Sequence, residues 1–465
     1  FYTHIRSWIE AQMTKQIDFT RGNITTQLIL FSLPLVAGEL LQSLYNSVDA
    51  LVVGNFVSDA ALGAVSVCAT LVNLVVGFFN GMSVGATSVV ARAVGRNDEV
   101  HLRQSIQITF TFSAALGAAL SLLGVLCTDF LIGLSAVEPE IFAEATVYLR
   151  IYLAGTFFTV IYNNGAGILR ATGDTRTPFL ILSISGVLNI LLDLLFVVAF
   201  RLGVAGVGYA TVISQSFSAL TVYRQINRQC SLNCLSPKTT FRDGGPTILE
   251  VIRIGIPSGV QGALISFSNL FVWRYVNPFG KAATAGVGIA LRLDKFISLP
   301  CKAIGMTTTT FVSQNIGARN RERVQKGIWH CMALSLGTTA FLELIVYLFS
   351  NQLVSLFNSN PEIIRIGVSM ERVLVPLYVL LATREVIVGI LRAHGYAQVT
   401  MLLSLVGMVG VRQLYLYLSM SSHPVLENVY RCFPLAWGST LVLLTVYYFL
   451  IRKSSAWEAE YELGR

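Results

Sequence analysis

The stretch GILRA occupies residues 167–171 and returns unchanged at residues 389–393, an offset of 222 residues. The same offset relates PEI at 139–141 to PEI at 361–363. It also relates Gly95 in ARAVGRNDEV to Gly317 in SQNIGARNRE. Three blocks on one offset indicate a chain made of two similar halves rather than a short-period solenoid.

The composition is that of a membrane protein. Hydrophobic residues make up 54% of the 465 and charged residues only 12%, with a mean hydropathy of +0.65. A soluble domain carries about 25% charged residues. Apolar runs of about 20 residues, enough to cross a bilayer as a helix, recur along the chain. They predict twelve spans, six in each half: 27–53, 62–88, 105–127, 143–169, 178–200 and 204–223, then 248–276, 284–312, 328–349, 364–391, 397–419 and 430–451.

The positive charges lie on one side of the predicted spans. Lys and Arg gather after spans 2, 4, 8, 10 and 12 and in the central linker, whereas the connections 54–61, 128–142 and 350–363 contain neither residue. This alternation follows the positive-inside rule and predicts that both termini are cytoplasmic. The net charge of +8 is therefore topological, and we expect no nucleic-acid partner.

Six spans per half give the two halves the same orientation, so the repeat is parallel. A duplicated chain of this kind is typical of a secondary transporter that binds its substrate between its halves. The predicted organisation is an N-terminal cytoplasmic segment, an amino lobe, a polar linker, a carboxyl lobe and a cytoplasmic tail, at 1–24, 25–224, 225–247, 248–452 and 453–465. The chain starts at Phe1, and Met13 is a candidate natural start.

Polar residues inside apolar spans mark a functional site, because charges are costly at bilayer depth. Asp49 lies deep in span 1, and Asn189 and Asp193 are one turn apart on one face of span 5. Thr211 lies in span 6. The amino lobe also holds four polar residues that we assign to a supporting network: Tyr45, Asn46, Tyr148 and Asn163.

The second half lacks this cluster. At the 222-residue offset, Asn189, Asp193 and Thr211 correspond to Val411, Tyr415 and Phe433, and Tyr148 corresponds to Met370. Asp49 corresponds to Phe271 or Val272, depending on a one-residue gap. The shared scaffold does not need these groups, which favours a function over a helix–helix hydrogen bond.

Two carboxylates in a poorly solvated cavity need a counter-cation. Burial and like-charge repulsion favour proton uptake, while Asp, Asn and Thr oxygens also suit Na⁺. The coupling ion therefore stays open between H⁺ and Na⁺, and no other metal and no cofactor are expected. Further polar residues are expected to line a cavity or to pair locally: Glu39, Arg292, Asp294 with Lys295, and Glu385 with Arg384.

Several motifs resemble the multidrug and toxic compound extrusion (MATE) transporters, and among them the bacterial DinF-like branch. They are FSLPLVAGELLQSLYNSVDALVVGNF, GILRATGDTRTP, NILLD and the paired loops VGRND and IGARN, and the resemblance covers residues 20–452. It implies a twelve-helix, two-lobed antiporter that expels cationic, lipophilic compounds in exchange for H⁺ or Na⁺. It also implies that Asp49, Asn189, Asp193 and Thr211 bind the coupling cation. The acidic residues that NorM-like relatives carry in helices 7 and 10 are not found at the comparable positions.

An alternative within transport is a lipid-linked precursor flippase of the same wider superfamily, although twelve spans and an acidic amino lobe argue against it. An enzyme is not expected, because the sequence contains no HExxH, GxSxG or DDxxD pattern. The expected protein is a monomer in the bacterial cytoplasmic membrane. Its expected partners are the lipid bilayer and small organic cations or lipophilic drugs.

Overall fold

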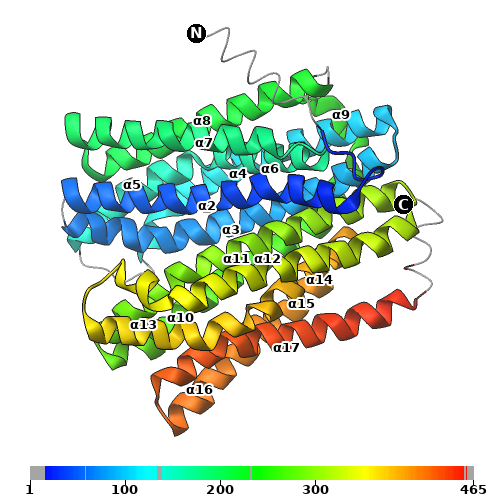
Figure 1. Cartoon of the computed structure of the whole chain (residues 1–465). Helices are drawn as coiled ribbons and strands as arrows, with labels where there is room; N and C mark the ends of the chain where they lie inside the picture. The colour runs from blue at the N-terminus through cyan, green and yellow to red at the C-terminus, as the bar shows by residue number, and fades with distance from the viewer. Residues whose placement is uncertain (1–15, 58, 134–138, 231–232, 455–456, 458–465) are drawn as a thin grey trace. The chain divides into compact units, whose positions relative to one another are not determined.

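The structure, a computed structural model, describes residues 16–57, 59–133, 139–230, 233–454 and 457 (Figure 1). Every regular element in these residues is a helix, and no strand occurs among them. The prediction of an all-α membrane protein is confirmed. The described residues divide into two compact units.

The amino unit contains residues 16–18 and Leu33–Gly259, so the first helix enters it only from Leu33 onward. The described residues of this unit contain six long helical stretches, followed by the short helix α9. Helix α10 begins in this unit and continues into the other one. The elements in chain order are α2 (Ile24–Phe56), α3 (Asp59–Gly95), α4 (Glu99–Gly133), α5 (Pro139–Ala154), α6 (Thr156–Ala171), α7 (Arg176–Asp193), the π-helix η1 (Leu194–Ala199), α8 (Gly203–Cys230), α9 (Pro237–Asp243) and α10 (Gly245–Val276).

The carboxyl unit contains Phe19–Ser32 and the described residues from Val260 onward. Its main core joins residues of α10, α11, α13, α14 and α17 around Tyr378 and Trp437. The elements that follow α10 are the 3₁₀-helix η2 (Asn277–Phe279), α11 (Lys281–Gly317), α12 (Arg321–Ser355), α13 (Pro361–Leu374), the 3₁₀-helix η3 (Val375–Leu377), α14 (Tyr378–Ala393), α15 (Ala397–Leu405), the π-helix η4 (Val406–Val411), α16 (Arg412–Ser422) and α17 (Leu426–Arg452).

Each predicted span coincides with one helix or with a run of consecutive helices. Nine helical stretches of the described chain are long and apolar enough to cross a bilayer, and a tenth span joins α5 and α6 across a 45° bend. The remaining two predicted spans are α8 and α11. Helix α11 carries Arg292, Asp294, Lys295 and Lys302, which makes it too polar to qualify by hydropathy.

The duplication is visible in the backbone. Asn97 and Arg319 both adopt a left-handed conformation, with φ of 54° and 57°. Gly173 and Gly395 do the same, with φ of 89° and 83°. Both pairs obey the 222-residue offset, so the two loops that follow corresponding helices turn in the same way in each unit.

The repeated GILRA motif brings two helices into close contact. A Cβ atom at Gly389 would lie 2.6 Å from the carbonyl oxygen of Gly305, and one at Gly167 would lie 2.8 Å from Ser83 Oγ. The Thr309 hydroxyl donates to the Gly389 carbonyl at 3.3 Å, and its counterpart Thr87 donates to the Gly167 carbonyl at 3.1 Å. Small residues let helices in a membrane approach this closely, which explains why both copies keep the motif.

The segment before α2 is anchored in the carboxyl unit. Phe19 is fully buried and packs against Phe31 and Phe311, with ring centroids 4.9 and 5.3 Å away. Its backbone N–H donates to Gln314 Oε1 at 3.1 Å. Its carbonyl accepts from Asn315 Nδ2 at 3.1 Å and from Arg323 Nε at 2.7 Å. Gln314, Asn315 and Arg323 of the loop SQNIGARNRER thus bind the backbone of Phe19. At the 222-residue offset, the amino unit has Arg92, Ala93 and His101 in their place.

We predict that Gly389→Ala destabilises the protein by about 1–3 kcal/mol, because the new methyl group meets backbone atoms that cannot move aside. Gly337→Ala is the matched control in α12, where a Cβ meets nothing within 4 Å. There the loss of backbone freedom in the unfolded chain should stabilise the protein by roughly 0.5–1 kcal/mol. Unfolding midpoints of the two purified variants in detergent measure the difference. Equal midpoints would contradict the packing argument.

Candidate functional site

The register between α7 and α8 brings Asn189 and Thr211 to the same level. The two helices pack side by side (Figure 1), and Ser185 Oγ in α7 donates to the Ser214 carbonyl in α8 at 3.0 Å. Because the two helices are antiparallel, the next turn of α7 meets the preceding turn of α8. Asn189 therefore lies opposite Thr211.

The predicted residues of α7 are buried. Asn189 is 2% exposed, and its side-chain oxygen and nitrogen both lack a hydrogen-bond partner within the described chain. Asp193 is fully buried. The π-helix η1 begins at the next residue, Leu194. Single π-helical turns inside α-helices are frequent at functional sites. Thr211, 7% exposed, donates only to its own helix, to the Val207 carbonyl at 3.0 Å.

Tyr148 lies near this level of the bundle, and Asn163 lies farther along the chain in α6. A Cβ at Gly208 would lie 3.0 Å from Ile151, which places α5 against α8, and Tyr148 is buried one turn earlier in a cluster with Val204 and Val207. Farther along, a Cβ at Gly155 would meet Val212 at 2.4 Å, next to Thr211. Asn163 is eight residues beyond Gly155, about 12 Å along a helix. Its amide donates to the Thr159 carbonyl in its own helix at 2.9 Å.

The predicted residues of the first helix lie largely outside the described side chains. The backbone of α2 contains Tyr45, Asn46 and Asp49, but their side chains are not among those described. Glu39 is half-buried, and it interacts electrostatically with Arg170 of the GILRA motif. Arg170 in turn donates to Ser83 Oγ at 2.7 Å.

In the carboxyl unit, Asp294 is held by hydroxyl groups. Tyr378 donates a short hydrogen bond to Asp294 Oδ1, and Ser298 donates to Oδ2 at 3.3 Å. Arg292 and Lys295 are both exposed, and neither forms an ion pair with Asp294 among the described residues. Glu385 forms the predicted ion pair with Arg384, and both side chains are buried.

Two further charged residues are buried in the carboxyl unit, and the sequence analysis assigned no role to either. Glu371 in α13 is 1% exposed, and neither of its carboxylate oxygens has a hydrogen-bond partner in the described part of the chain. Arg412, the first residue of α16, is also 1% exposed. An arginine inside the apolar run VGMVGVRQLYLYL was the signal that could have identified it.

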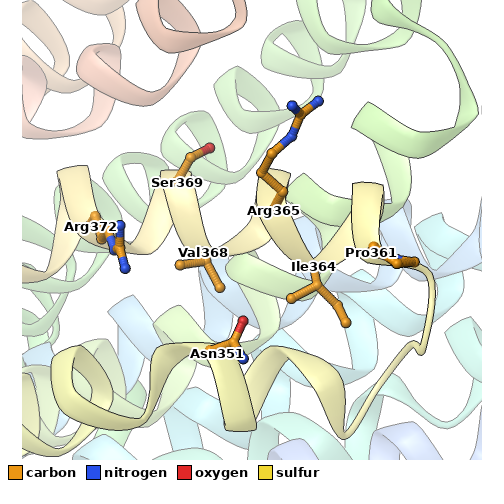
Figure 2. A pocket seen from close by; sticks show the side chains of 7 residues that line it. All are labelled: Asn351, Pro361, Ile364, Arg365, Val368, Ser369 and Arg372. Atoms are coloured by element: carbon orange, nitrogen blue, oxygen red, sulfur yellow. The ribbon is translucent and has the colours of Figure 1, made fainter.

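Figure 2 shows a pocket of the carboxyl unit that is separate from all of these residues. Asn351 projects from α12 toward α13, which supplies the other lining side chains. The lining residues are Asn351, Pro361, Ile364, Arg365, Val368, Ser369 and Arg372. Most of them are exposed, so the pocket is a surface depression. No residue predicted to bind the coupling ion lines it.

Comparison with known proteins identifies the family. The sequence pattern of the MatE family matches residues 34–195 and again residues 257–418. The chain belongs to the MatE family. It is therefore a transporter and not an enzyme, and the predicted family is confirmed. The same pattern matches once in each half, as expected for a duplicated chain.

Individual relatives agree with this assignment. The chain is 29% identical over 392 residues to the "Probable multidrug resistance protein YpnP" of Bacillus subtilis, covering 84% of this chain and 87% of that one. It is 28% identical over 446 residues to "Probable multidrug resistance protein YoeA" of the same organism, covering 93% and 95%. A solved "multidrug resistance MATE family transporter of the MOP superfamily" superposes with a TM-score of 0.86 at 22% identity, covering 94% and 98%. Its twelve-helix, two-lobed fold is that of this chain.

The family match adds a second offset between the halves. Both matched ranges start and end 223 residues apart rather than 222. GILRA lies inside both ranges at an offset of 222, so the offset changes along the repeat. After GILRA, the π-helix η4 accommodates one extra residue in the carboxyl unit just before Arg412. Asn189 therefore corresponds to Arg412 rather than to Val411, and Asp193 corresponds to Leu416. In the first helix of each half, Asn46 corresponds to Asn269 and Asp49 to Val272.

We predict that Glu371→Met raises the free energy of unfolding by about 1–3 kcal/mol, because it removes a buried polar group that has no partner. The gain should be larger in alkaline than in acidic buffer, since only the ionised carboxylate carries the full cost of burial. Glu427→Met is the control, because Glu427 is exposed and pairs with Arg431 on the surface. It should change stability by less than about 0.5 kcal/mol. A Glu371→Met protein less stable than the parent would show that Glu371 has a stabilising partner.

Proposed function

We propose that this protein is a secondary active multidrug efflux antiporter that exports cationic or lipophilic compounds in exchange for H⁺ or Na⁺. The coupling ion binds in the amino unit, at Asp49, Asn189, Asp193 and Thr211. The observation that carries the proposal is the burial of Asn189 and Asp193 on one face of α7, beside a π-helix and opposite Thr211. Polar groups at this depth of an apolar bundle are expensive unless they bind something.

The carboxyl unit supports the grouping of α2 with α7. Asn269 and Arg412, the counterparts of Asn46 and Asn189, are joined by a hydrogen bond of 2.7 Å. By the repeat, Asn46 should lie beside Asn189 in the amino unit. Asp49 lies three residues after Asn46 in α2, and Asp193 lies four residues after Asn189 in α7. Each aspartate is therefore about one helical turn beyond its asparagine. Because α2 and α7 cross the membrane in the same direction, the two aspartates reach the same depth and share one cation.

The chemistry of exchange follows from this charge arrangement. Two carboxylates that share a dry cavity bind a proton or Na⁺ to balance their charge. A cationic substrate in the same cavity competes with that ion electrostatically. Release of the ion on one side of the membrane and rebinding on the other then drives export, if the lobes alternate between inward- and outward-open states.

The remaining parts of the proposal rest on the sequence and on the relatives. The names of two relatives contain "multidrug resistance", which supports organic drugs as substrates. The distribution of Lys and Arg supports cytoplasmic termini in a bacterial cytoplasmic membrane. We propose that the protein works as a monomer, because each predicted ligand of the coupling ion comes from one amino unit.

We predict that Asp49→Asn and Asp193→Asn each reduce ion-driven efflux to the level of empty vesicles, since one carboxylate can no longer bind and release the ion. Asp129→Asn is the matched control. Asp129 is exposed and pairs with Arg150 at 2.7 Å, so its loss should leave efflux unchanged. The measurement is drug efflux from proteoliposomes that contain equal amounts of each variant.

The same vesicles separate the two ions. Efflux driven by an imposed pH gradient without Na⁺ identifies H⁺ as the coupling ion, and efflux driven only by a Na⁺ gradient identifies Na⁺. Gradient-driven efflux by Asp49→Asn or Asp193→Asn at the parental rate would exclude that residue from coupling. Export of a lipid-linked precursor, without export of any organic cation, would favour a flippase.

A further inference from the structure

The guanidinium group of Arg412 is buried without a balancing charge. Its Nη1 donates to Asn269 Oδ1 at 2.7 Å, and its Cζ lies 5.9 Å from the centroid of the Phe433 ring. Neither Nε nor Nη2 has a hydrogen-bond partner in the described chain. No carboxylate among the described residues forms an ion pair with this arginine. The group therefore presents two free donors and a full positive charge inside the protein.

The surroundings of Arg412 cannot provide the missing charge. Leu416, Val429 and Cys432 are all fully buried in the carboxyl core around α16 and α17. The nearby polar residues of α10 are neutral, and one of them, Ser268, is occupied by Gln413, whose Nε2 donates to its hydroxyl at 2.9 Å. An uncompensated buried charge is strongly destabilising, so an opposite charge beside Arg412 would stabilise the site.

The repeat places Arg412 at the position equivalent to the cation site proposed for the amino unit. Arg412 and Asn269 correspond to Asn189 of the predicted cation site and to Asn46 of its supporting network. At the 222-residue offset, Phe433 corresponds to Thr211. The carboxyl copy replaces a neutral amide by a guanidinium and the two acids Asp49 and Asp193 by Val272 and Leu416. The same location therefore has negative charge in one unit and positive charge in the other.

We propose that the carboxyl unit contains an anion-binding site, in which Arg412 Nε and Nη2 bind a small anion or the anionic group of an organic solute. Asn269 positions the guanidinium through its side-chain oxygen. Asn269 is exposed on the carboxyl unit, whereas Arg412 is not, so an anion reaches the guanidinium past Asn269. The guanidinium nitrogens donate hydrogen bonds from one plane. Chloride and carboxylates are suitable ligands because both accept hydrogen bonds and carry a negative charge. The correspondence with the amino unit rests on the proposed cation site, whereas the unpartnered guanidinium nitrogens do not.

The test is the thermal unfolding midpoint of the purified protein in detergent, measured in sodium salts at constant Na⁺ concentration. Chloride is the inorganic probe, benzoate is the organic carboxylate probe, and a bulky sulfonate buffer is the reference. A ligand that binds only the folded protein raises the midpoint with increasing concentration. We expect a saturable rise with at least one probe. A rise with chloride identifies an inorganic anion, and a rise with benzoate alone identifies the anionic group of an organic solute.

Three variants assign the effect to Arg412. Arg412→Gln should lose the anion-dependent rise, whereas Arg431→Gln, which removes an exposed arginine of α17 paired with Glu427, should keep it. Asn269→Asp places a carboxylate beside the guanidinium. It should raise the midpoint in the reference buffer and abolish the response to added anions, and it keeps the test decisive if Arg412→Gln fails to fold. The proposal is overturned if neither probe shifts the parent protein, or if Arg412→Gln responds as the parent does.

Discussion

In a bundle that crosses a bilayer, a buried polar group cannot be solvated by the surrounding lipid, so it must find its partner inside the protein. Most side chains of this chain meet that constraint by being apolar. A few instead bond to their own helix, as Thr211 does to Val207, or form an internal ion pair, as Arg384 does with Glu385. Among the described residues with buried polar atoms that have no partner are Asn189, Glu371 and two nitrogens of Arg412. An ion or a ligand would satisfy these groups, which is why two of the three carry the proposals made above.

The sequence predicts the fold well because hydrophobic length is a strong signal. The twelve spans and the two halves follow from apolar runs and from an exact repeat. The hydropathy of α8 and α11 is too low to identify them as spans, yet their place in the repeat still does so. The bend between α5 and α6 and the π-helices η1 and η4 are harder to predict, because one extra residue in a helix leaves the composition unchanged.

The candidate site is predicted only in part, for the same reason. Asp193 and Asn189 stand out from sequence because they are polar in an apolar span with helical spacing. Arg412 is equally polar and equally buried, but a strict 222-residue offset pairs Asn189 with Val411 and hides the correspondence. Only when the extra residue at η4 is counted does Arg412 become the counterpart of Asn189. The place of Asn163 in the network stays a prediction, since its amide donates to the Thr159 carbonyl of its own helix.

The anchoring of Phe19 has a consequence for the modular history of the chain. Duplication copied a length of sequence that ends within the linker, but the compact units do not have the same limits. The carboxyl unit contains Phe19–Ser32, which the chain synthesises before any part of the amino unit's helices beyond Leu33. A protein divided at the linker would leave Phe311, Gln314, Asn315 and Arg323 without the segment that covers them. The boundaries of the repeat and the boundaries of the compact units therefore differ, because the carboxyl unit takes its covering segment from the other end of the chain.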